Sequence, residues 1–150
     1  MKRLVLAAAA AAGLVTALPA AAQFQKPEDA IKYRKAAFTV MANHFGRVAA
    51  MASGKVPFDA AAVQANAEIV ATMSKLPYAG FIEGTSTGET KAKPEIWTEQ
   101  DKFKAAASKM QEEVAKLNVA AKGGNIDQIK AAVGDVGKSC KACHDNYRKE

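Results

Sequence analysis

Apolar side chains recur at intervals of three and four residues in four stretches of the chain, the spacing that places them on one face of an α-helix. The stretches cover residues 27–52, residues 59–76, the residues from Thr98 to the glycine pair at 123–124, and residues 125–148. The last stretch has the most regular pattern: Ile126, Ile129, Val133, Val136, Cys140, Cys143 and Tyr147. No stretch shows the alternation typical of a β-strand. The pattern therefore predicts an all-α protein, built as an antiparallel four-helix bundle.

Residues that favour helix starts stand at the beginning of these stretches. Pro27 fits the first turn of a helix, where its missing N–H costs nothing. Asp59 is the expected N-cap of the second helix, because its side chain can accept a hydrogen bond from the backbone. Thr98 is followed by Asp101 three residues later, which resembles a capping box and predicts the start of the third helix.

The links between the expected helices differ in length. The first and second helices, and the third and fourth, are joined by short links, so each pair should be antiparallel neighbours. The second and third are joined by residues 77–97, and a link of that length is unusual in a compact domain. Such a link either lies against a functional site or crosses the surface, and the sequence favours neither.

The first 22 residues have the three parts of a secretory signal peptide. Lys2 and Arg3 precede an apolar run over residues 4–18, Pro19 ends the run, and three alanines at 20–22 form a small-residue cleavage site. The run is short for a membrane anchor, and charges interrupt every later apolar run. We therefore expect cleavage after Ala22, export to the periplasm and a mature domain of residues 23–150.

Charge and length exclude several classes of protein. The chain has a formal charge of +6, and removal of Lys2 and Arg3 leaves 19 basic and 15 acidic residues. The basic residues are scattered, which is typical of solvated helix faces and not of a nucleic-acid-binding surface. The mature chain is one domain, too small for a large multidomain enzyme. Its two cysteines are too few for a miniprotein built on disulfides.

The residues that carry chemistry lie near the C-terminus, in the run Cys140-Lys141-Ala142-Cys143-His144. Two thiols three residues apart lie on one face of a helix, about one turn apart. Each can add to one of the two vinyl groups on the same edge of a haem, and the following imidazole can bind the iron from the same side. The run is typical of covalent attachment of haem c, one per chain.

Three other interpretations of the cysteines are weaker. A redox disulfide of the thioredoxin type lies where a strand meets a helix, and no strand is expected here. A zinc site needs four ligands, and His44 is the sole other histidine. Two buried, inert cysteines would not explain the histidine that follows directly.

The second axial position of the iron decides the function. An open position binds a diatomic gas, whereas a second protein ligand favours electron transfer. The candidate ligands are Met41, Met51, Met73, Met110 and His44. We interpret the methionines as core residues, since methionine fills irregular gaps between helices, and His44 as a surface or helix-end residue.

Four runs make the chain resemble the bacterial cytochrome c′ family over essentially its whole mature length. They are residues 140–148 (CKACHDNYR), 26–34 (KPEDAIKYR), 44–47 (HFGR) and 94–97 (PEIW). Many unrelated cytochromes share the haem motif, but its place near the end of the last of four helices is more specific. The resemblance implies a five-coordinate iron with His144 as its axial ligand, a periplasmic location and often a homodimer packed through the first two helices.

The resemblance also implies roles for three further residues. Arg34 matches a basic residue near a haem propionate, and Phe38 matches the apolar position that crowds the distal face of the haem. Arg148 matches a basic residue beside the axial histidine. The family binds nitric oxide and carbon monoxide and excludes most other ligands, and an apolar distal pocket gives bound dioxygen no hydrogen bond.

The expected function is therefore a gas-binding haem protein that can also exchange electrons with periplasmic partners, and not an enzyme. A six-coordinate, low-spin electron carrier of the same fold is the alternative. A peroxidase is disfavoured, because the sequence offers no distal histidine with a basic partner. We expect no nucleic-acid partner, and no membrane partner after signal cleavage.

Overall fold

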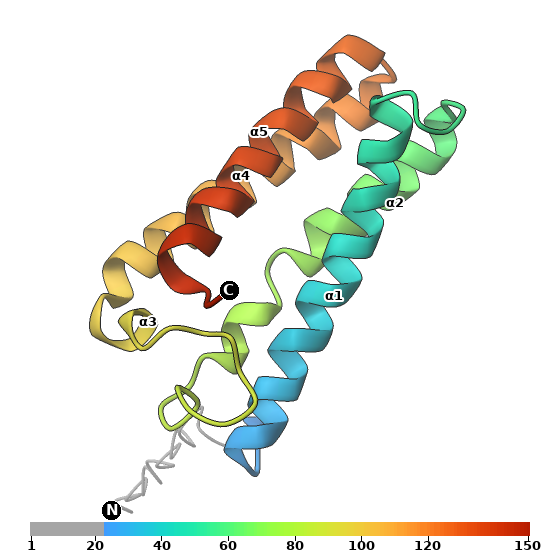
Figure 1. Ribbon diagram of the computed structural model, residues 1–150. Coiled ribbons are helices and arrows are strands. Elements are labelled where there is room, and N and C mark those ends of the chain that lie inside the picture. Colours follow the sequence, from blue (N-terminus) through green and yellow to red (C-terminus); the bar gives the residue numbers. More distant parts are fainter. Residues whose placement is uncertain (1–22) are drawn as a thin grey trace, which may run out of the picture.

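The computed structural model describes residues 23–150, and the expected signal peptide with its cleavage site after Ala22 lies outside them (Figure 1). The described part contains four long helices: α1 (Pro27–Ala52), α2 (Ala60–Met73), α4 (Gln100–Gly123) and α5 (Ile126–Tyr147). A 3₁₀ turn, η2 (Pro77–Gly80), and a single helical turn, α3 (Glu95–Thr98), lie between α2 and α4. No β-strand occurs within residues 23–150, which confirms the all-α prediction.

Local capping explains most of the helix boundaries. Pro27 occupies the first turn of α1, and the Asp59 carboxylate accepts a 3.0 Å hydrogen bond from the backbone N–H of Ala62 at the start of α2. The Asn125 side chain caps α5 in the same way. Gly124 caps the C-terminal end of α4, and its φ of 69° lies in the left-handed region that favours glycine.

The predicted capping box at Thr98 and Asp101 is wrong. Thr98 is the last residue of α3, and α4 begins two residues later at Gln100, after an irregular residue, Glu99, with no side-chain cap. The Thr98 hydroxyl points back to the carbonyl of Glu95, within its own helical turn. Helical structure thus begins before Thr98, at Glu95, and the irregular residue Glu99 interrupts it between α3 and α4.

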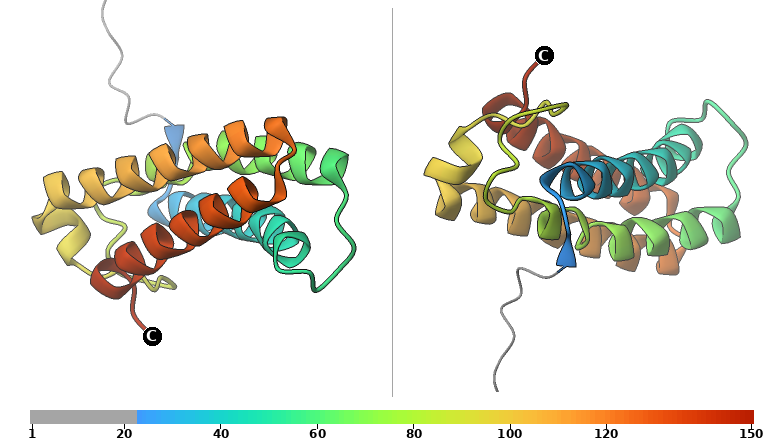
Figure 2. Two further views of the ribbon diagram at one scale, coloured as in Figure 1. Left: turned by 90° about the horizontal axis from the view of Figure 1, so that it is seen from above. Right: turned by 90° about the horizontal axis from the view of Figure 1, so that it is seen from below.

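The four long helices form a bundle of two antiparallel pairs (Figures 1 and 2). α1 packs along α2 and α4 along α5, and the pairs meet where α2 contacts α4 and α1 contacts α5. The central core is apolar and includes Val48, Val63, Val70, Leu117 and Ile129, each almost fully buried. Toward the end of the bundle where α3 lies, the pairs diverge, and residues 77–97 lie between them (Figure 1).

The link of residues 77–97 is fastened to the C-terminal end of the chain. The backbone N–H of Lys93 donates to the carbonyl of Tyr147 over 3.0 Å, and the N–H of Lys149 donates to the carbonyl of Lys91 over 2.8 Å. A second apolar cluster, centred on Ile96, Phe103 and Tyr147, fills the space beneath it. In the described part of the chain, no helix is both long and apolar enough to cross a bilayer.

Candidate functional site

A cavity of about 930 Å³ lies where the two helix pairs diverge. α1 forms one wall with Phe38, α5 forms another with Cys140, Cys143 and His144, and the link closes the end with Tyr78 and other residues. Because residues of the link line this cavity, the link lies against the candidate site and does not merely cross the surface. The cavity is of the size that encloses an organic cofactor.

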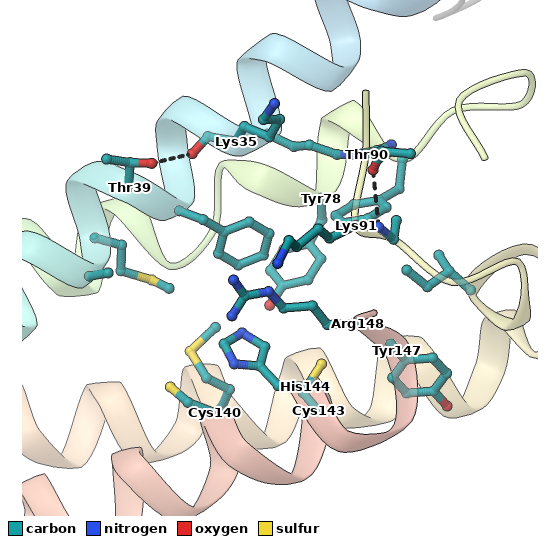
Figure 3. A pocket seen from close by; sticks show the side chains of 18 of the residues that line it. Lys35, Thr39, Tyr78, Thr90, Lys91, Cys140, Cys143, His144, Tyr147 and Arg148 are labelled. Carbon is teal, nitrogen blue, oxygen red and sulfur yellow. Dashed lines mark hydrogen bonds between the residues drawn. The ribbon is translucent and has the colours of Figure 1, made fainter. Parts of the chain in front are cut away.

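Cys140 and Cys143 lie one helical turn apart on α5, and both sulfur atoms face the cavity (Figure 3). Both are free thiols and half-buried. Burial raises the pKa of both thiols, so in this state they are neutral S–H groups. Among the described residues no cluster of three or more His, Cys, Asp or Glu side chains could hold a metal ion, so the zinc interpretation finds no ligand set.

His144 follows Cys143 and lines the same cavity (Figure 3). Its pKa is lowered, first by partial burial and then by the positive charge of Arg148, with Asp145 acting in the opposite direction. A lowered pKa favours the neutral imidazole, which is the form that binds a metal. Arg148 ends α5 one turn further along, and its side chain also reaches the cavity.

Aromatic rings form much of the remaining wall. Phe38 is half-buried and meets the ring of Tyr78 edge to face, with the centroids 6.1 Å apart. Phe81 contacts the rings of Phe38 and Phe103 at 6.4 Å and 5.0 Å, and Tyr147 contacts Phe103 at 5.2 Å. Contacts of this kind join α1, the link, α4 and α5 into one apolar wall.

Arg34 lies at the cavity edge, but its guanidinium group faces the link. It is 2% exposed, and it donates to the carbonyl oxygens of Gly80 and Thr85 and to the hydroxyls of Thr85 and Thr90, over 2.7–2.8 Å. It also lies 4.5 Å from the ring centroid of Phe81. Burial lowers its pKa to about 10. Four of its five N–H groups are thus used within the protein, so its expected contact with a propionate stays a prediction.

The candidates for a second iron ligand separate into two groups. Met41 and Met110 are buried and line the cavity, whereas Met51 and Met73 are not among the residues that line it. His44 belongs to α1 and its side chain faces α2, where its Nδ1 is 2.7 Å from the side-chain oxygen of Asn66; it is not among the residues that line the cavity.

The sequence left the contribution of the link open and singled out none of its residues as part of the site. Tyr78, Phe81 and Lys91 line the cavity, yet none lies in a stretch with helical periodicity. One signal was available: the link contains aromatic residues, which an exposed crossover does not need. Together, two thiols one turn apart, an adjacent imidazole and an aromatic wall across the cavity fit a haem.

Comparison with known proteins gives consistent results. The family model for cytochrome c′ matches residues 29–148. The chain is 55% identical to the cytochrome c′ of Rubrivivax gelatinosus over 129 residues, which cover 85% of this chain and all of that protein. It is 51% identical to the cytochrome c′ of Alcaligenes xylosoxydans xylosoxydans over 128 residues, covering 85% of this chain and 99% of that protein.

Solved structures agree with these relatives. The crystal structure of the Rubrivivax gelatinosus cytochrome c′ matches with a TM-score of 0.82, over 85% of this chain and 100% of that one. A nitric oxide complex of a mutant cytochrome c prime from Alcaligenes xylosoxidans matches with a TM-score of 0.81 at 50% identity, over 85% of this chain and 99% of that one.

Proposed function

The chain belongs to the cytochrome c′ family, and we propose that it is an exported haem protein whose iron keeps one axial position open to small gases. Members of this family carry covalently bound haem c. The observation that carries the proposal is the meeting of Cys140, Cys143 and His144 with Phe38 around one cavity. Thiols and imidazole lie on one wall and an aromatic side chain on another, so the two sides of the site differ chemically.

Cys140 and Cys143 would hold the haem by two thioether bonds, each formed when a thiol S–H adds across a vinyl group. His144 would bind the iron from the α5 side. The haem supplies an iron centre that binds diatomic gases and changes oxidation state. The protein would fix the edge of the haem and one ligand of the iron, and would limit the access of small molecules to the other side of the iron.

Phe38 and Arg148 would act on opposite sides of the iron. The Phe38 ring would crowd the distal side and slow the entry of ligands such as carbon monoxide. Arg148 would act on the proximal side, where its cation lies close enough to His144 to lower the pKa of the imidazole. Unchanged nitric oxide binding kinetics and spectra in Arg148→Ala would contradict this role.

An electron carrier with a six-coordinate, low-spin iron is the second candidate. It is favoured by Met41 and Met110, which line the cavity. The chain is also 33% identical to a cytochrome c-554 of Cereibacter sphaeroides, over 91% of this chain and 92% of that protein. Electron transfer with a periplasmic partner is compatible with both candidates, and we propose no catalytic residue.

Absorption spectroscopy separates the two candidates. We expect high-spin spectra for the purified ferric and ferrous protein, and a new ferrous spectrum when carbon monoxide is added. A low-spin spectrum at rest that carbon monoxide leaves unchanged would favour the electron carrier. Mass spectrometry gives an independent test of attachment: the exported protein should weigh one haem more than residues 23–150, and the double variant Cys140→Ser/Cys143→Ser should not.

We also propose a homodimer that uses the first two helices. Val40 on α1, Ile69 on α2 and Leu76 just after it are large apolar side chains that are 37–41% exposed. A second copy of the chain packed on these helices would cover them. Sedimentation of the wild type and of Val40→Glu tests this, since the charge should shift the holoprotein toward the monomer. Val119→Glu, at an exposed apolar position on α4, is the control.

A further inference from the structure

The ammonium group of Lys91 has no protein partner among the described residues. Lys91 belongs to the link and lines the cavity, and its side chain reaches inward from the wall across from Cys140 and Cys143 (Figure 3). The ammonium of its near neighbour Lys93 donates to the carbonyl of Asp145 over 2.9 Å, whereas that of Lys91 meets no acceptor within residues 23–150. Its three N–H donors are therefore free for a molecule bound in the cavity.

The backbone of Lys91 is held in place from two sides. Its carbonyl accepts a 2.8 Å hydrogen bond from the N–H of Lys149, beyond the end of α5. The preceding residue, Thr90, accepts a 2.8 Å hydrogen bond on its hydroxyl from Arg34 of α1. Both helices that border the cavity thus fix the point from which the Lys91 side chain starts, and its tip alone is free to adjust.

Positive charge exceeds negative charge around the cavity. Two of the cations are engaged with the link: four N–H groups of Arg34 are used there, and the Lys35 ammonium donates to the carbonyl of Glu89. Lys91 and Arg148 are the other two. Glu89 is the one acidic side chain among the described residues that line the cavity. A bound anion on the Lys91 side would balance this surplus.

A haem brings such an anion to the site, because it carries two propionate groups that are carboxylates at neutral pH. They are on other pyrrole rings than the vinyl groups, so a haem bonded to Cys140 and Cys143 has its carboxylates elsewhere on its rim. A lysine ammonium forms charge-assisted hydrogen bonds with a carboxylate. Arg34 has one N–H left to offer, whereas Lys91 has all three.

We propose that Lys91 is a positioning residue for the haem and that its ammonium pairs with one propionate carboxylate. The inference rests on the proposed function, because it requires a haem in this cavity. It assigns to the link the contact that the family resemblance implies for Arg34: Arg34 holds the link, and the link holds the propionate. Since Lys91 is exposed, water screens the pair and its effect is modest.

The test compares Lys91→Gln with the wild-type holoprotein, because this change removes the charge and keeps most of the length. Without the cation, the negative propionate favours ferric over ferrous iron. We expect the ferric-to-ferrous ratio at a fixed potential to rise about threefold, which lowers the reduction potential by about 30 mV. The propionate bending band in the resonance Raman spectrum should also shift. Lys91→Arg keeps the charge and should restore both values.

Lys93→Gln is the matched control. It removes the same charge two residues along the link, from a side chain that is not among those that line the cavity, so the propionate band should stay at its wild-type position. An unchanged propionate band in Lys91→Gln, with a potential no lower than that of Lys93→Gln, would overturn the inference while leaving the proposed function intact. An exported wild-type protein that carries no haem would overturn both.

Discussion

Replacing Arg34 by methionine should loosen the link of residues 77–97, and with it one wall of the cavity. Methionine has a similar length and keeps the apolar contact with Phe81, but it has no donors. The change would leave four acceptors on the link without their present partner: the carbonyls of Gly80 and Thr85 and the hydroxyls of Thr85 and Thr90. The two hydroxyls can rotate, whereas the two carbonyls are fixed.

The size of the effect follows from these acceptors. Thr85 is fully buried and Gly80 is also buried, and a buried carbonyl left without a donor costs about 1–3 kcal/mol. Relief from burying a cation offsets part of the loss. We therefore expect the free energy of unfolding to fall by about 3 kcal/mol, which for a domain of this size lowers Tm by about 10 °C.

Thermal and urea unfolding of the holoprotein measure this loss, and hydrogen exchange locates it. Protection should decrease in residues 81–92 and stay unchanged in α4. Arg34→Lys keeps the charge but not the fork of donors, so it should give an intermediate loss. Lys35→Met is the control, since Lys35 is exposed and makes one 3.2 Å bond; it should cost less than about 0.5 kcal/mol. Equal losses in Arg34→Met and Lys35→Met would refute the reasoning.

Other variants test separate parts of the structure. Gly80→Ala should lower the free energy of unfolding by about 1–3 kcal/mol, because a Cβ would meet the α1 backbone, whereas Gly134→Ala in α5, which meets open space, should raise it by about 0.5–1 kcal/mol. Two lysine side chains hydrogen-bond Glu113 and lower its pKa. Glu113→Gln should therefore destabilise the protein more at neutral pH than at acidic pH below that lowered pKa, where wild-type Glu113 is protonated as well. Urea titrations measure these effects. Phe38→Ala should bind carbon monoxide faster and more tightly in flash photolysis, and unchanged binding would contradict its distal role.

Helical periodicity predicted the four long helices well, because each needs one continuous apolar face. The residues 27–52 expected for the first helix are those of α1, and the stripe on the last helix places Cys140 and Cys143 on the face that meets the cavity. Capping was predictable where one side chain acts on the next turn, as at Asp59. It failed at Thr98, because α3 packs its own turn against the second apolar cluster before α4 begins.

The position of Arg34 could not be predicted, because its partners lie 46 to 56 residues further along the chain. From the sequence, Arg34 and Phe38 lie one turn apart on one helix face, which predicts that both contact the same ligand. In the structure Phe38 faces the cavity, while Arg34 is turned into the link. Local spacing fixes the face of a helix, but tertiary contacts decide what each side chain on that face binds.

The link connects the two roles on α1, because Arg34 binds the link and Phe38 faces the cavity that the link lines. The two helix pairs diverge at one end of the bundle, and residues 77–97 lie between them there and line the cavity. The buried Arg34 cation fixes the link to α1, and the backbone hydrogen bonds of Lys93 and Lys149 fix it to the end of α5. The helix that carries His144 and the helix that carries Phe38 are thereby joined through the segment that carries Tyr78. Any change that loosens the link should therefore alter ligand binding even where it leaves the helices intact, and Arg34→Met is the variant in which the two effects can be measured together.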